Sequence, residues 1–238
     1  MRLLCLILGM ILSFGVLAQP NSESVSIGPG LDPSKVFPLA AKYRLPEFTT
    51  GHLITFDGKR SQNLTLNFNL FSEAPQFLDK NGDTLFLDTN LAEFIHLGTV
   101  DYFYDKDHYY EIIKNTEPIK LAIRRRWRVA RIVSNNSVGE RVGDAQVNTQ
   151  ERRGALVFSP ALGKMVRNEN TIYEVDLTYF LIDKNKAVHK ANKASFLRLQ
   201  KTNKAELESF LSSEKIDFNK EADLIYLVET ISKGYFGK

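Results

Sequence analysis

Cysteine is nearly absent from this chain of 238 residues, which has only Cys5. Cys5 lies in an apolar N-terminal run that we expect to be removed, so the remaining chain would contain no thiol. Such a chain has no disulfide bonds, thiolate nucleophiles or cysteine-bound metal ions. Its stability must therefore come from an ordinary hydrophobic core, which a chain of this length can build.

An excess of charge of one sign is also lacking. The chain has 31 Lys and Arg against 28 Asp and Glu, a formal net charge of +3, and loss of Arg2 with the N-terminal run would leave +2. This balance argues against a dedicated nucleic-acid-binding protein. Apolar residues at 43% and aromatic residues at 11% are typical of a folded globular chain.

Motifs for catalysis and metal binding are lacking as well. The sequence has no Gly-x-Ser-x-Gly elbow and no glycine-rich loop that would hold a phosphate. Residues 79–83 do not have the spacing of a calcium-binding loop. We therefore predict no metal ion and no cofactor. The four histidines, which are not spaced as metal ligands, are His52, His96, His108 and His189.

The N-terminus has the pattern of a secretory signal peptide over residues 1–18. Arg2 supplies a positive charge, residues 3–12 are apolar, and residues 16–18 form the small-residue site after which a signal peptidase cuts. A retained transmembrane anchor needs about 20 apolar residues, but Ser13 and Gly15 interrupt this run. We therefore predict an exported protein of the periplasm or cell surface, with no transmembrane segment in the mature chain.

Period-two patterns and turn residues predict the fold class. Prolines and glycines keep residues 19–46 extended. Alternation over residues 64–70 and the Asn81-Gly82 turn begin a series of short strands over residues 47–190, joined by connections too short for parallel crossovers. Residues 134–169 lose this periodicity and predict a mobile loop.

Residues 191–238 change to a helical period. Asn203 and Glu206 have the spacing of a capping box, and an apolar stripe follows in residues 224–231. The predicted fold is α+β: an antiparallel β-rich domain, either a meander or a partly closed barrel, with a short C-terminal helical unit.

Several of these segments resemble a family of uncharacterised exported bacterial proteins. The resemblance rests on residues 65–71, 81–85 and 109–113, and on the C-terminal stretch 193–225. It implies a signal peptide and an α+β domain, and it brings no catalytic residue to this chain.

Residues 124–131 contain the strongest local charge feature. On a strand, Arg124, Arg126 and Arg128 would project from one face, and Arg125 and Trp127 from the other. Such a row could bind phosphate, an anionic glycan or a lipid headgroup through its guanidinium groups. The alternative is a solvated face paired with acids of the adjacent strand, such as Glu111.

Aromatic residues gather on a predicted hairpin that includes Tyr102 and Tyr104. Tyrosines that point outward can stack on sugars or on partner side chains. The alternative is cross-strand aromatic packing without any ligand.

Together these features favour an exported, non-catalytic binding or interaction module of the periplasm or cell surface. Its expected partner is an envelope protein, an anionic glycan or a lipid headgroup. The alternative is an enzyme, such as a hydrolase, whose site has no recognisable motif.

The signal-peptide hypothesis makes a direct prediction. Cleavage after Ala18 should give a mature chain that begins at Gln19. Intact-mass measurement of the protein recovered from the cell envelope checks this. A recovered chain that still contains residues 1–18 would contradict the predicted export.

Overall fold

A computed structural model describes residues 24–88, 91–134 and 169–234. The predicted signal peptide and residues 135–168 of the predicted loop lie outside these described residues. None of the helices in the described part combines the length and the apolar character that a bilayer crossing requires.

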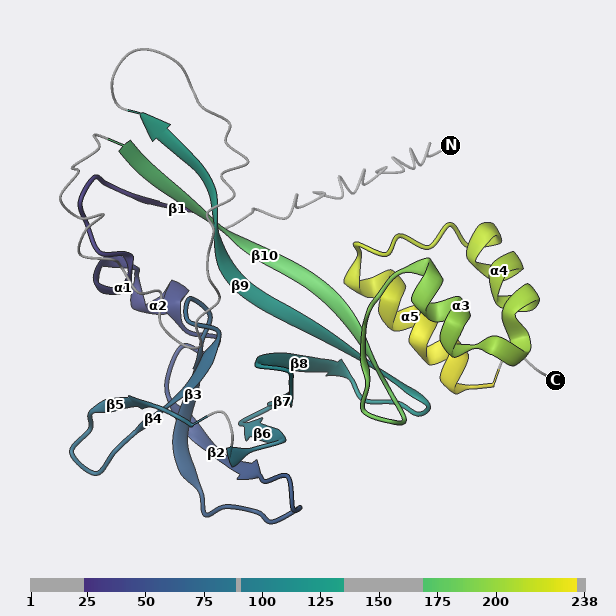
Figure 1. The fold of residues 1–238 in the computed structure, drawn as a ribbon, viewed down its shortest axis with the longest axis horizontal. Helices are drawn as coiled ribbons and strands as arrows, with labels where there is room; N and C mark the ends of the chain where they lie inside the picture. Colours follow the sequence, from purple (N-terminus) through teal and green to yellow (C-terminus); the bar gives the residue numbers. More distant parts are fainter. Residues whose placement is uncertain (1–23, 89–90, 135–168, 235–238) are drawn as a thin grey trace, which may run out of the picture.

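The described chain forms one antiparallel sheet with helices at its C-terminal end (Figure 1). The strand order is β1-β10-β9-β8-β7-β6-β2-β3-β4-β5, and β11 also pairs with β10. This confirms the predicted antiparallel α+β fold. The strands are β1 (Ser24–Ile27), β2 (Thr49–Ile54), β3 (Leu64–Asn69), β4 (Ala74–Leu78), β5 (Thr84–Phe86), β6 (Phe94–Leu97), β7 (Val100–Asp105), β8 (His108–Lys114), β9 (Ile119–Ser134), β10 (Glu169–Asp183) and β11 (Val188–Lys190).

The sheet is curled but not closed. Beyond its pairing with β8, β9 donates a hydrogen bond from Trp127 N to Leu70 O at 3.2 Å, just after the end of β3. This bond joins two strands that are five places apart in the sheet order. β9 and β10, with 16 and 15 residues, are much longer than ordinary strands. They run from the pairing of β10 with β1 at one end to the C-terminal helices at the other (Figure 1).

The alternation in β3 predicted one buried face and one solvent-exposed face. The prediction of an exposed face was wrong. Leu66 and Phe68 are buried as expected, but Asn67 and Asn69 are also buried. The side chain of Asn67 accepts a bond from Leu45 N and donates to Leu45 O. The segment before β2 thus covers this face, and the amide groups satisfy its backbone.

Residues 24–46 are packed against the sheet, whereas the sequence predicted an extended segment without helix. β1 pairs with β10, and two one-turn helices follow, α1 (Pro33–Val36) and α2 (Leu39–Lys42). Pro33 opens α1 and Pro38 precedes α2, positions at which the fixed φ of proline suits a helix start.

An aromatic cluster holds this segment in place. The ring of Phe37 lies 4.8 Å from that of Trp127 and 5.6 Å from that of Tyr173, centroid to centroid. Trp127 Nε1 donates to Ala41 O at 2.7 Å. The segment is therefore an integral part of the fold in the described residues.

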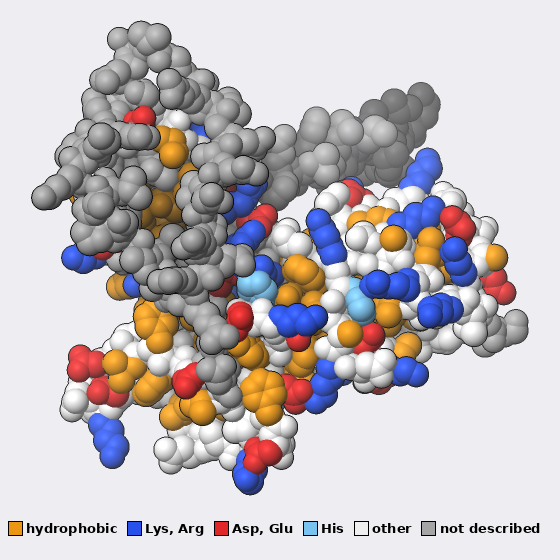
Figure 2. All heavy atoms as spheres, viewed as in Figure 1, with side chains coloured by type: hydrophobic (Ala, Val, Ile, Leu, Met, Phe, Trp, Pro, Cys, Tyr) orange, Lys and Arg blue, Asp and Glu red, His pale blue; other side chains and the backbone are white. Residues whose placement is uncertain are grey.

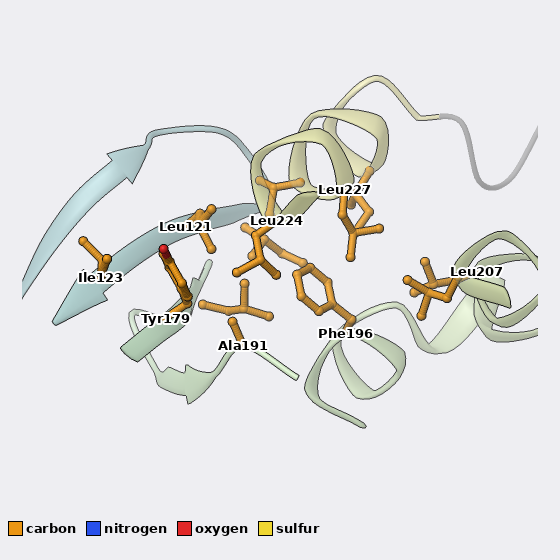
Figure 3. Close-up of a cluster of buried hydrophobic side chains, with 13 residues drawn as sticks. Leu121, Ile123, Tyr179, Ala191, Phe196, Leu207, Leu224 and Leu227 are labelled. Carbon is orange, nitrogen blue, oxygen red and sulfur yellow. The ribbon is translucent and has the colours of Figure 1, made fainter. Parts of the chain in front are cut away.

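The C-terminal helices cover one end of β9 and β10 with a shared core. They are α3 (Lys193–Leu199), α4 (Lys204–Ser213) and α5 (Glu221–Ser232), with a 3₁₀ turn, η2 (Lys201–Asn203), before α4. Figure 3 shows Leu121 of β9, Phe196 of α3 and Leu224 of α5 directed into a common space. All three are completely buried.

The helix starts differ in part from the predicted capping box at Asn203 and Glu206. Asn192 caps α3 by accepting a bond from Ser195 N at 2.9 Å. Asn203 precedes α4 as predicted, but its side chain makes no capping hydrogen bond. Asp217 orders the entrance to α5 by accepting a bond from Asn219 N. The predicted apolar stripe of α5 is confirmed, because Leu224, Leu227, Val228 and Ile231 are all buried.

Phe196 should be a main source of stability for the helical unit. Phe196→Ala would leave a cavity between the sheet and α5, so the free energy of unfolding should fall by about 3–5 kcal/mol. Leu39→Ala is the matched control, because Leu39 is 72% exposed and its loss should cost about 0.5 kcal/mol or less. Urea unfolding followed by circular dichroism measures both. Equal losses would contradict the assigned core.

Candidate functional site

The arginine row lies on one face of β9, as the alternation predicted, but acids of this protein engage it. Arg126 Nε lies 3.1 Å from Asp176 Oδ2 on β10, and Arg128 Nε lies 3.6 Å from the other oxygen of Asp176. Glu73, in the turn between β3 and β4, pairs with both Arg124 and Arg126. Of the two alternatives, pairing of the arginines with acids of the same protein describes this face, and the acids are Glu73 and Asp176.

Exposure of the row increases along the strand. The side chain of Arg124 is 16% exposed, that of Arg126 36% and that of Arg128 55%. Arg128, although it pairs with Asp176, is therefore the most exposed arginine of the row. A role of the whole row in binding stays a prediction.

Glu111 belongs to a different charge cluster, on the other side of β9. It is 4% exposed and accepts two bonds of 2.8 Å from Arg44. Arg125 Nε donates to it at 3.2 Å, and the other end of Arg125 lies 3.6 Å from Glu221 of α5. The hydrogen bond to Glu111 raises the pKa of Arg44. We call Arg44, Glu111, Arg125 and Glu221 the Glu111 cluster.

Tyr102 and Tyr104 do not form an exposed binding surface. They are 2% and 9% exposed. Phe68 stacks on Tyr102 with ring centroids 4.3 Å apart, and Tyr104 packs against Tyr109 at 4.9 Å. Burial raises the pKa of the Tyr102 phenol well above its ordinary value. Of the two alternatives that the sequence offered, aromatic packing between strands describes both residues, and outward-facing tyrosines do not.

Two of the four histidines, His52 and His96, lie side by side. His52 stacks on His96 at 4.5 Å, and His96 Nδ1 lies 2.6 Å from Asp101. Desolvation, with the charge of Arg60 as a smaller contribution, lowers the pKa of His52. Within the described ranges, no group of three or more His, Cys, Asp or Glu side chains could hold a metal ion.

The helical unit has a basic pocket that the sequence analysis did not predict. It has a volume of about 400 Å³ and lies over α3, η2 and the start of α4. Arg198, Lys201 and Lys204 supply its charge, and Ala194 and Leu197 supply its apolar surface. Figure 2 shows Lys and Arg side chains spread over the helical unit.

A sequence signal for this pocket was present. Residues 184–205 contain seven Lys and Arg and no Asp or Glu. The overall charge balance conceals this run, because acids elsewhere in the chain offset it. A second hollow, between α4 and α5, is smaller, at about 190 Å³, and its lining includes both Glu214 and Lys233. The charged residues that line the basic pocket, in contrast, are all cations.

Comparison with known proteins found no match to this chain among protein families, curated proteins or solved structures. The resemblance described from the sequence therefore stays a hypothesis.

The Glu111 cluster should be essential to stability. Glu111→Gln would leave Arg44 and Arg125 beside a neutral amide, and breaking a buried ion pair in this way costs about 3–5 kcal/mol. Glu208→Gln is the control, because Glu208 pairs with Lys193 at an exposed site, 3.6 Å apart, where a pair contributes about 1 kcal/mol or less. Urea unfolding compares the two. A Glu111 variant as stable as the control would contradict the structural role.

Proposed function

We propose that the protein is an exported, non-catalytic binding module that attaches to the anionic headgroups of a lipid surface through the basic pocket. The observation that carries this proposal is that the two lysines of the pocket, Lys201 and Lys204, are exposed and unpaired among the described residues. Arg124, Arg126 and Arg128 of β9, in contrast, form ion pairs with Glu73 or Asp176.

The composition of the pocket favours a lipid headgroup among anionic ligands. Each lysine or arginine near an anionic membrane surface contributes about 1 kcal/mol of attraction. Ala194 and Leu197 add apolar surface between the cations, which suits an amphiphile whose charge adjoins hydrocarbon. The predicted export would bring this surface to the cell envelope. No specific observation within the described residues favours the enzyme alternative.

Removal of the two lysines should weaken binding strongly. In a flotation assay with vesicles of phosphatidylcholine and phosphatidylglycerol, Lys201→Gln with Lys204→Gln should reduce affinity about 30-fold, since two cations contribute about 2 kcal/mol. The matched control is Lys215→Gln with Lys220→Gln, which removes equal charge from the loop between α4 and α5. The control should bind nearly as well as the unmodified chain.

Other outcomes would contradict the proposal. Equal losses in both double variants would indicate attraction by overall charge without a pocket. Binding to a sulfated heparin oligosaccharide but not to anionic vesicles would replace the lipid with a glycan. Loss of vesicle binding only on changing Arg124, Arg126 and Arg128 to Gln would move the site to the arginine row.

A further inference from the structure

One wall of the basic pocket is held by a histidine. His189, on β11, lies between Arg198 of α3 and Asp183 at the end of β10. Arg198 Nη2 lies 2.7 Å from His189 Nδ1, and His189 Nε2 lies 3.1 Å from Asp183 Oδ2. Among the described residues, Arg198 and Asp183 are the charged groups that contact this imidazole, and Lys190 follows it on the strand.

The two contacts define the protonation state of His189. A guanidinium group can only donate hydrogen bonds, so Nδ1 must accept from Arg198 and therefore carries no proton. The proton of the neutral ring is then on Nε2, which donates to Asp183. Protonation of Nδ1 would place two donors face to face at this distance, and the bond to Arg198 would be lost.

We propose that His189 makes ligand binding at the basic pocket depend on pH by restraining Arg198 when it is neutral and releasing it when it is protonated. This inference rests on the proposed function and assigns its regulation. The released guanidinium group can then turn to a phosphate or sulfate oxygen in the pocket, for which its paired donors are suited.

Asp183 determines which of its two contacts His189 loses on protonation. Its Oδ1 accepts bonds from Asn185 N at 2.8 Å and Ala187 N at 3.0 Å, so the turn holds this carboxylate in place. Protonated His189 keeps its bond to Asp183 and gives up the one to Arg198. The summed charge of Asp183, His189 and Arg198 rises from zero to +1, so affinity for an anion increases as the pH falls.

The test measures vesicle affinity of the chain from Gln19 onward between pH 8 and pH 5.5. The phosphodiester of phosphatidylglycerol keeps its charge over this range, so a change in affinity reports a change in the protein. One added unit charge close to an anion in water corresponds to about a fivefold gain in affinity. We expect a gain of that size for the unmodified chain at pH 5.5.

Two variants assign the effect to this contact. His189→Gln retains an acceptor for Arg198 but cannot become charged, so its affinity should not change with pH. His52→Gln is the matched control, because His52 stacks on His96 away from the pocket. It should retain the full pH dependence. A His189 variant that retains the dependence would overturn the proposal.

A second measurement needs no variant. Calorimetric titration of the unmodified chain with vesicles at pH 6.5, in two buffers of different ionisation enthalpy, should show proton uptake on binding, because linkage makes the coupling reciprocal. Vesicle binding without proton uptake or pH dependence would overturn the role of His189 and leave the proposed function intact. Lack of vesicle binding at every pH would instead overturn the proposed function.

Discussion

The buried carboxylate of Glu111 is the interaction on which the arrangement of this fold depends. A carboxylate at 4% exposure is tolerated only when its charge is paired and its oxygens accept hydrogen bonds. Arg44 and Arg125 meet both needs, and they come from the segment before β2 and from β9. Arg125 also reaches Glu221 in the first turn of α5. One charge cluster thus joins the N-terminal segment, the curled sheet and the helical unit.

This constraint favours arginine, because its planar donors fit carboxylates, as Arg44 does with two bonds to Glu111. The long β9 strand uses Arg124 and Arg126 in a similar way, against Glu73 and Asp176. Lysines predominate in the acid-free run 184–205. Since acids of the same protein engage the β9 arginines, the lysine-rich helical face is the better candidate for an external anion.

Local patterns predicted the elements of this fold, whereas contacts between distant residues decided the character of each face. Period two placed Arg124 and Arg126 on one face correctly, but their partner Glu73 lies 51 residues from Arg124 in a turn that no local pattern marks. The orientation of Tyr102 stayed open for the same reason, because Phe68, which covers it, comes from another strand. The prediction of the apolar stripe of α5 was confirmed, because burial there follows from helical spacing alone. The basic pocket was predictable in principle from its run of like charge.

The position of His189 explains why a local protonation could act on the pocket without disturbing the fold. The hairpin that carries His189 ends at Ala191, which is 5% exposed, and α3 is anchored by the fully buried Phe196. Both backbones beside the contact are therefore held by the same core, on which α5 also packs. Tightly packed cores resist small displacements. When His189 is charged, its Nδ1 and the Arg198 guanidinium group are both donors and must move apart. The side chain that moves is then Arg198, which is exposed and borders the pocket.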